Sequence, residues 1–123
     1  MVSNHVFKVV FVGNANVGKT KMAKWLLLGE LSPINGYVAT LGVDVNVFRY
    51  NYSTYNLWDC GGDERFKGLG KGYYIKGDIF FIFEEGEGKS IDEWEDEIRE
   101  VAPNATIHVV NSNFTREDIL ALL

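Results

Sequence analysis

Apolar and polar residues are spaced along this chain in a way that predicts five β-strands. In the second strand Val43, Val45 and Val47 are separated by Asp44 and Asn46, which is the two-residue period of a strand with one buried face. The fourth is apolar throughout, as expected for a strand buried on both faces. The predicted strands are Val6–Val12, Val43–Tyr50, Tyr55–Asp59, Ile79–Phe83 and Thr106–Val110.

Other segments follow the helical period. Apolar residues recur at helical spacing across Ser90–Val101, with Pro103 just beyond, so we expect a helix there and another from Lys19 to about Leu28. The polar Asn51–Ser53 region predicts a hairpin between the second and third strands. Alternating strands and helices indicate an α/β fold with a mostly parallel five-stranded sheet flanked by helices, in one domain covering residues 1–123.

Composition narrows the class of protein. A chain of 123 residues with 46% apolar residues can bury a core but little more than one sheet with its helices. The net charge of −5 argues against nonspecific nucleic-acid binding. A single cysteine forms no internal disulfide, which suits the cytoplasm or nucleus. We expect no membrane anchor, because no apolar run reaches membrane-spanning length and the C-terminal end carries no cysteine for prenylation.

Between the first strand and the first helix lies the octet Gly13-Asn14-Ala15-Asn16-Val17-Gly18-Lys19-Thr20. It fits the phosphate-binding pattern G-x-x-x-x-G-K-[ST] between a strand and a helix N-terminus. The backbone N–H groups of such a turn surround an anion, and the helix dipole adds positive potential. Lys19 is then expected on the β- and γ-phosphates and the Thr20 hydroxyl on Mg²⁺. All eight residues are predicted to bind a nucleotide.

A second part of a phosphate site follows the third strand. Asp59 ends that strand and Gly62 follows three residues later, so that a carboxylate can hold Mg²⁺ while the Gly62 N–H meets a γ-phosphate oxygen. Thr40, in the connection before the second strand, can close over the metal. We therefore predict Thr20, Thr40 and Asp59 as metal ligands and add Thr40 and Gly62 to the nucleotide-binding residues.

Together with the octet, three segments closely resemble the Ran branch of the Ras-like small GTPases: Tyr37–Val45, Trp58–Phe66 and Gly68–Ile75. The resemblance is strong from Phe7 to about Phe83. It implies a P-loop NTPase fold of the Ras type in truncated form, which binds GTP or GDP with Mg²⁺ and engages Ran-type protein partners. A mobile second switch is expected around the glycines of its last part, Gly68, Gly70, Gly72 and Gly77.

Two departures from this family point to slow hydrolysis. Where the family has a glutamine that orients the attacking water, this chain has Asp63, which is shorter, has no N–H to donate and repels the γ-phosphate. Ala15 occupies a position that is often glycine in Ras, where a side chain hinders an incoming arginine finger. We assign the catalytic positions to Asp63 and Lys19 and expect weak GTPase or NTPase activity at most.

The resemblance is weakest where the family reads guanine. The family carries an N-K-x-D motif after the fifth strand, but Asn111 and Asn113 are followed at the fourth position by Phe114 and Arg116, not by Asp. Leu31 replaces the aromatic residue that flanks the base. Losing groups that pair with a ligand's polar edges removes discrimination, so we expect weakened guanine selectivity and binding of other nucleoside triphosphates.

Two functions remain open from these residues. One is a Ran-like nucleotide-binding protein that holds Mg²⁺ and a triphosphate and hydrolyses it slowly or not at all. The other is a pseudo-GTPase, an interaction module that displays Ran-like switch surfaces to transport or regulatory partners. The complete set of Lys19, Thr20, Thr40 and Asp59 favours the first, because a pure mimic has no physical need for all four.

The end of the chain predicts a cover for one face of the sheet. The family's final helix lies there, near the first and third strands, and this chain stops before that helix. Thr115 followed by Asp118 resembles a helix start, and apolar residues follow at 119, 120, 122 and 123. Two outcomes are open: a homodimer that buries the exposed face, or a helix from Thr115 to Leu123 folded back over it.

Overall fold

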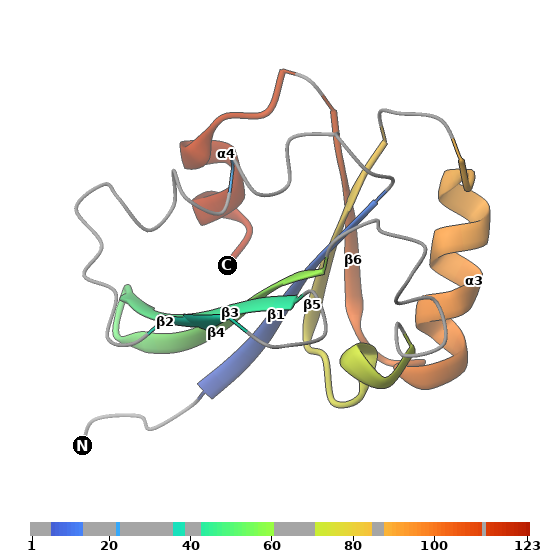
Figure 1. The fold of residues 1–123 in the computed structure, drawn as a ribbon. Helices are drawn as coiled ribbons and strands as arrows, with labels where there is room; N and C mark the ends of the chain where they lie inside the picture. Colours follow the sequence, from blue (N-terminus) through green and yellow to red (C-terminus); the bar gives the residue numbers. More distant parts are fainter. Residues whose placement is uncertain are drawn as a thin grey trace.

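The computed structural model describes residues 6–13, 22, 36–38, 43–60, 71–84, 88–111 and 113–123. Its strands are β1 (Val6–Gly13), β2 (Gly36–Val38), β3 (Val43–Tyr50), β4 (Ser53–Cys60), β5 (Ile79–Phe83) and β6 (Thr106–Val110). They form one six-stranded sheet in the order β2-β3-β4-β1-β5-β6 (Figure 1). Strands β4, β1, β5 and β6 are parallel, and β3 is antiparallel to both β2 and β4.

The predicted α/β fold with a mostly parallel sheet is confirmed, and all five predicted strands are present. The predicted number of strands is corrected from five to six, because Gly36–Val38 pairs with β3 at the edge of the sheet. The predicted hairpin is also present. Its two turn residues, Asn51 and Tyr52, have φ of 51° and 68°, the left-handed conformation that matches the twist of a two-residue hairpin.

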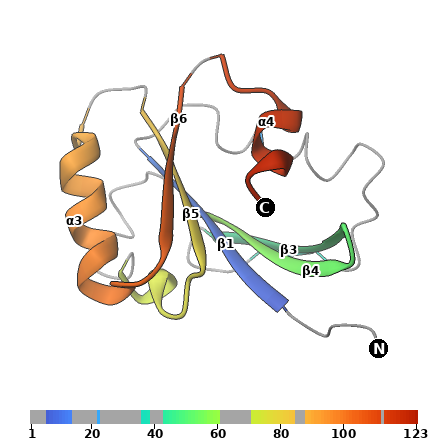
Figure 2. The same ribbon diagram turned by 180° about the vertical axis from the view of Figure 1, so that it is seen from behind.

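The sheet is buried on both faces by helices, which Figure 2 shows from behind. On one face lie α3 (Ile91–Val101) and the 3₁₀ helix η2 (Lys71–Tyr74), and on the other lies α4 (Arg116–Ala121). We call the two cores the α3-side and α4-side clusters. The α3-side cluster contains Val10, Val12, Val45, Tyr74, Phe80, Ile82, Ile98, Ala102 and Ala105. The α4-side cluster contains Val9, Phe11, Met22, Phe48, Tyr55, Leu57, Phe81, Phe83, Val110, Ile119 and Leu120.

The helix predicted over Ser90–Val101 is confirmed as α3. Ser90 is its N-cap: the Glu93 N–H donates to the Ser90 hydroxyl at 3.2 Å, and the Ser90 N–H donates to the Glu93 carboxylate at 3.3 Å. This reciprocal pair satisfies two N–H groups that a helix start otherwise leaves without partners. At the other end Arg99 donates to the carbonyls of Pro103 and Ala105, at 2.9 and 2.7 Å. These bonds fix the turn from α3 into β6.

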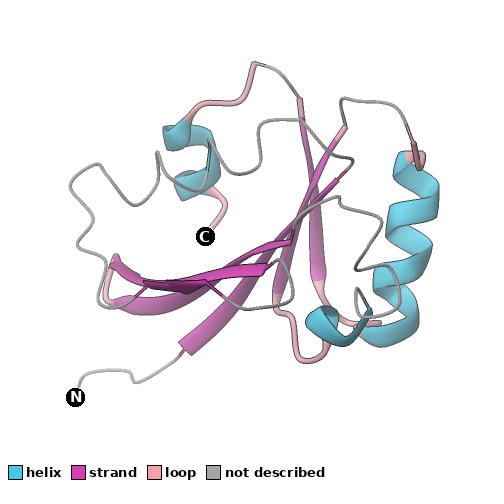
Figure 3. Cartoon of the chain, viewed as in Figure 1, coloured by secondary structure: helices cyan, strands magenta, loops and turns pink. Residues whose placement is uncertain are grey.

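The chain after β6 folds back over the sheet as α4, the second of the two predicted outcomes (Figure 3). Thr115 and Asp118 form the same reciprocal cap, at 3.2 and 2.8 Å. Ile119 is 0% exposed and Leu120 is 7% exposed, both within the α4-side cluster. The Tyr55 hydroxyl donates to the carbonyl of Leu123 at 3.4 Å and joins the end of the chain to β4. Helix α4 therefore covers the sheet face that a homodimer was otherwise expected to bury.

At Gly77 the structure corrects the expectation that the glycines near η2 mark a mobile segment. It is buried, and a Cβ at this position would lie 2.5 Å from Cε1 of Phe80 and 3.1 Å from the Tyr74 carbonyl oxygen. Gly72 is exposed, and a Cβ there would meet nothing within 4 Å. Gly77 is thus required by close packing before β5. Gly68 and Gly70 lie outside the described residues.

Candidate functional site

The first glycine of the octet and the predicted metal carboxylate lie on neighbouring parallel strands. Asp59 on β4 is directly beside Phe11 on β1, and Gly13 follows Phe11 by two positions. Parallel strands end at the same edge of a sheet, so the end of β1 and the end of β4 lie next to each other. Ligands of open α/β sheets bind outside this carboxyl edge. The register therefore brings Gly13 and Asp59, one residue from each predicted site segment, to the edge where ligands of open α/β sheets bind.

Gly13 has a backbone conformation that explains the glycine at the start of the octet. Its φ is 151°, in the region that residues with a side chain rarely adopt. The residue is buried and pairs with Phe83 on β5. An alanine at position 13 would therefore strain the backbone at the end of β1.

Asp59 is 4% exposed and is the one buried polar or charged side chain among the described residues. It shares a strand face with Tyr55 and Leu57, both of the α4-side cluster. Burying a carboxylate is costly unless it is paired, hydrogen-bonded or bound to a metal. A carboxylate oxygen is also a hard ligand of the kind Mg²⁺ prefers. The burial and chemistry of Asp59 fit the predicted metal ligand.

The other predicted site residues lie outside the described residues: Asn14, Ala15, Asn16, Val17, Gly18, Lys19, Thr20, Thr40, Gly62 and Asp63. Leu31 lies outside them as well. Of the helix predicted from Lys19 to about Leu28, the structure describes Met22, which is helical and 8% exposed within the α4-side cluster. Of the predicted ligands, Gly13 and Asp59 are thus the two whose positions the structure gives.

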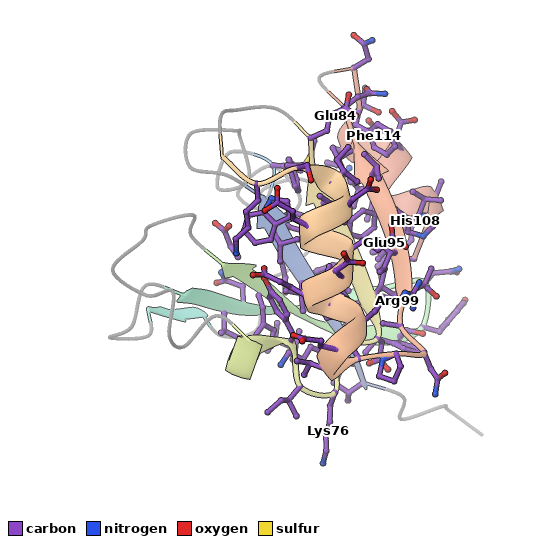
Figure 4. The ribbon with its side chains drawn as sticks, turned by 90° about the vertical axis from the view of Figure 1, so that its right-hand side faces the viewer. Lys76, Glu84, Glu95, Arg99, His108 and Phe114 are labelled. Atoms are coloured by element: carbon purple, nitrogen blue, oxygen red, sulfur yellow. The ribbon has the colours of Figure 1, made fainter. Side chains whose placement is uncertain are left out.

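The chain beyond β6 reaches the same edge of the sheet. Gly13 pairs with Phe83, and Phe83 pairs with Val110, so that Asn111 follows at the edge where the octet begins. Asn111 forms a local turn in which its side-chain Oδ1 accepts from the Asn113 N–H at 2.8 Å and its carbonyl accepts from the Phe114 N–H at 3.1 Å. Figure 4 shows Phe114 and Glu84 at this end of the sheet.

Sequence reasoning identified Phe114 only as the residue that stands where the family has Asp. In the structure Phe114 is partly buried against the α4-side cluster. The carboxylate of Asp118, four residues after Phe114, accepts the Thr115 N–H in the helix cap. The turn after β6 is therefore built from side chains that serve the fold. In the sequence, the spacing of Thr115 and Asp118 predicted the start of the helix that follows this turn. It did not predict the packing of Phe114.

Within the described parts of the chain, no group of three or more His, Cys, Asp or Glu side chains is arranged to hold a metal ion. The helices described there are also too short or too polar to cross a membrane.

A mostly parallel sheet with Gly13 at the end of β1 and a buried carboxylate at the end of the neighbouring β4 is consistent with a Ras-like P-loop domain, the class that the family comparison shows. The family model described as Ras of Complex, Roc, domain of DAPkinase matches residues 8–114. This match spans most of the chain, and the protein therefore belongs to the Roc family of Ras-like GTP-binding domains.

Proposed function

We propose that this Roc domain binds a Mg²⁺–nucleoside triphosphate at the carboxyl edge of the sheet, with slow or absent hydrolysis and weakened guanine selectivity. The observation that carries the proposal is the register that brings the end of β1, where the octet begins, beside Asp59 at the end of β4. A phosphate chain and its metal need backbone N–H groups and a carboxylate at neighbouring positions; the octet that begins at Gly13 would supply the N–H groups, and Asp59 the carboxylate.

The proposed roles of the residues follow from the motifs in the sequence. Residues 13–18 surround the phosphates with backbone N–H groups, and Lys19 pairs with the β- and γ-phosphates. Thr20, Thr40 and Asp59 hold Mg²⁺, and the Gly62 N–H meets the γ-phosphate. Mg²⁺ supplies charge neutralisation of the phosphates when bound.

The turn after β6 supports the proposal of weak selectivity for guanine. Asn111 already accepts the Asn113 N–H with its side-chain oxygen, and Asp118 is held in the helix cap. Phe114, at the position of the family's Asp, is apolar and packs on the core. Discrimination of guanine from adenine requires polar groups that pair with the base edge. We therefore propose that the domain discriminates only weakly between GTP and ATP.

A second candidate is supported by Asp63 and by the substitution at Phe114. In this candidate the domain is an interaction module, and the segments Tyr37–Val45 and Gly68–Ile75 contact protein partners of the Ran type in the cytoplasm or nucleus. The two candidates differ in whether nucleotide binding is strong enough to measure and depends on the octet.

Isothermal calorimetry with Mg²⁺ and GTP, and then with Mg²⁺ and ATP, tests the proposal. Lys19→Ala should weaken binding about tenfold or more, because it removes a charge-assisted contact of about 1.5–3 kcal/mol. Lys76→Ala is the matched control: this lysine is exposed and lies before β5, at the opposite edge of the sheet. Equal affinity in the parent and Lys19→Ala, or no binding at all, would contradict the proposal and favour the interaction module. A thousandfold preference for GTP would contradict the weak selectivity alone.

A further inference from the structure

Strands β1, β5 and β6 are parallel neighbours that end in one row at the carboxyl edge of the sheet. Gly13 on β1 pairs with Phe83 on β5, which in turn pairs with Val110 on β6. The chain leaves these strands through the octet after β1, Glu84 after β5 and Asn111 after β6. Neighbouring strands lie about 4.8 Å apart. Glu84 therefore stands between the start of the octet and the turn after β6.

The backbone of Glu84 is fixed at this edge, whereas its carboxylate is not used by the fold. The Glu84 N–H donates to the Val110 carbonyl at 3.0 Å, which extends the pairing of β5 with β6 by one residue. Its side chain is exposed, and within the described parts of the chain its carboxylate forms no hydrogen bond or ion pair (Figure 4). The next cation along the chain, Lys89, is paired with Glu97 at 2.6 Å.

The order of the three strand ends matches the order of the three parts of a nucleotide. In the proposed function, on which this placement rests, the phosphates bind at the octet after β1 and the base lies beside the turn after β6. The ribose joins the phosphates to the base. It therefore lies over the end of the strand between them, which is β5, and Glu84 is the residue with which β5 leaves the sheet.

We propose that the Glu84 carboxylate accepts hydrogen bonds from the 2′- and 3′-hydroxyls of the ribose, and that the domain thereby selects ribonucleotides over deoxyribonucleotides. The two oxygens of a carboxylate can accept from two adjacent hydroxyls, and a charged acceptor forms stronger hydrogen bonds than a neutral one. An acidic residue beyond the phosphate-binding turn holds the ribose in dinucleotide-binding sheets as well. A contact to the sugar is independent of the base, which suits a site that discriminates weakly between GTP and ATP.

Isothermal calorimetry with Mg²⁺ and GTP, 2′-deoxy-GTP or 2′,3′-dideoxy-GTP tests this contact. In the wild-type chain, loss of the 2′-hydroxyl should weaken binding about tenfold, because one charge-assisted hydrogen bond is lost. Loss of both hydroxyls should weaken binding further. ATP and its two deoxy forms should give the same ratios of affinity, because the ribose is common to both nucleotides.

Glu84→Ala should bring the ratio of affinities for GTP and 2′-deoxy-GTP close to one. The ratio is the readout because removing a negative charge near the phosphates changes the affinity for every triphosphate, and this shared effect cancels in a double-mutant comparison. Glu84→Gln keeps an acceptor without the charge and should give an intermediate ratio. Equal melting temperatures verify folding, since the backbone N–H of Glu84, and not its carboxylate, bonds to β6.

Glu100→Ala is the matched control. This glutamate is also exposed, but it lies near the end of α3, where the chain turns to enter β6 at the opposite edge of the sheet. The variant should therefore keep the wild-type ratio of affinities for GTP and 2′-deoxy-GTP.

Three results would overturn the proposal. A wild-type ratio near one, or a ratio that persists in Glu84→Ala, would exclude the ribose contact while leaving nucleotide binding intact. A change in the preference for GTP over ATP in Glu84→Ala, with the ribose ratio unchanged, would assign Glu84 to the base instead. Absence of binding for every triphosphate would contradict the proposed function and the ribose contact together.

Discussion

Asp59 on β4 pairs with Phe11 on β1, and both residues are buried: Asp59 is 4% exposed and Phe11 is 0% exposed. A charge in such a place is unfavourable for the fold alone, because an apolar residue of similar size would avoid the cost of dehydration. The proposed role in binding would give this carboxylate a function at the edge where β1 and β4 end. The candidate metal ligand Asp59 is therefore adjacent to Phe11 of the α4-side cluster.

Asp59→Asn tests that role with little change in size. We expect the affinity for a Mg²⁺–triphosphate to fall about tenfold or more, since an amide oxygen is a weaker partner for the cation than a carboxylate. Calorimetry measures the affinity, and the ligand-free melting temperature of each variant shows whether it folds as the parent does. The exposed Asp96→Asn on α3 is the control, and an equal loss of affinity in both variants would rule out a specific role for Asp59.

Helix α4 is predicted to be held by its buried face. Ile119 is 0% exposed within the α4-side cluster, so Ile119→Ala should lower the free energy of unfolding by about 2–5 kcal/mol. Leu122, which follows α4 and is 37% exposed, gives the control: Leu122→Ala should cost clearly less. Urea unfolding followed by tryptophan fluorescence measures both. Similar losses for the two variants would mean that α4 contributes nothing specific to the core.

Most of the fold could be predicted because its signals are local. The apolar run Ile79–Phe83 and the alternation of Val43–Tyr50 gave the correct bounds of two strands. Thr115 with Asp118 predicted the cap of α4 for the same reason, since the capping residues lie three positions apart. Asp59 was predicted as a metal ligand because it stands at the end of a strand with Gly62 three residues later, and that role stays a prediction.

The missed features depend on neighbours that are remote in sequence. Gly36–Val38 is a strand because β3 lies beside it, and three residues carry no period of their own. Phe114 was identified by what it replaced, whereas its position follows from the core beneath it. Gly77 was interpreted as a mobile glycine, but the ring of Phe80 fills the space where its side chain would be.

A pair of glycine variants separates packing from backbone freedom near η2. Gly77→Ala should lower the free energy of unfolding by roughly 1–3 kcal/mol, because its Cβ would lie 2.5 Å from Cε1 of Phe80, whose side chain is 0% exposed and cannot move freely. Gly72→Ala introduces a methyl group into open space and should change stability by less than about 1 kcal/mol. Chemical denaturation of both variants decides the point. If Gly72→Ala costs as much as Gly77→Ala, backbone freedom and not packing explains both glycines.

Asp63→Gln should accelerate hydrolysis if slow turnover comes from the aspartate that replaces the family's water-orienting glutamine. Asp63 stands where the Ras-like family has glutamine, and a carboxylate has no N–H to donate to the phosphate and repels it. Glutamine accepts from the water and donates to the γ-phosphate, so single-turnover hydrolysis of GTP should be faster in the variant by about tenfold or more. Asp63→Asn is the matched control: it removes the charge but stays short, and it should gain less than the glutamine. A parent protein that hydrolyses briskly and is slowed by Asp63→Gln would show instead that Asp63 acts as a general base.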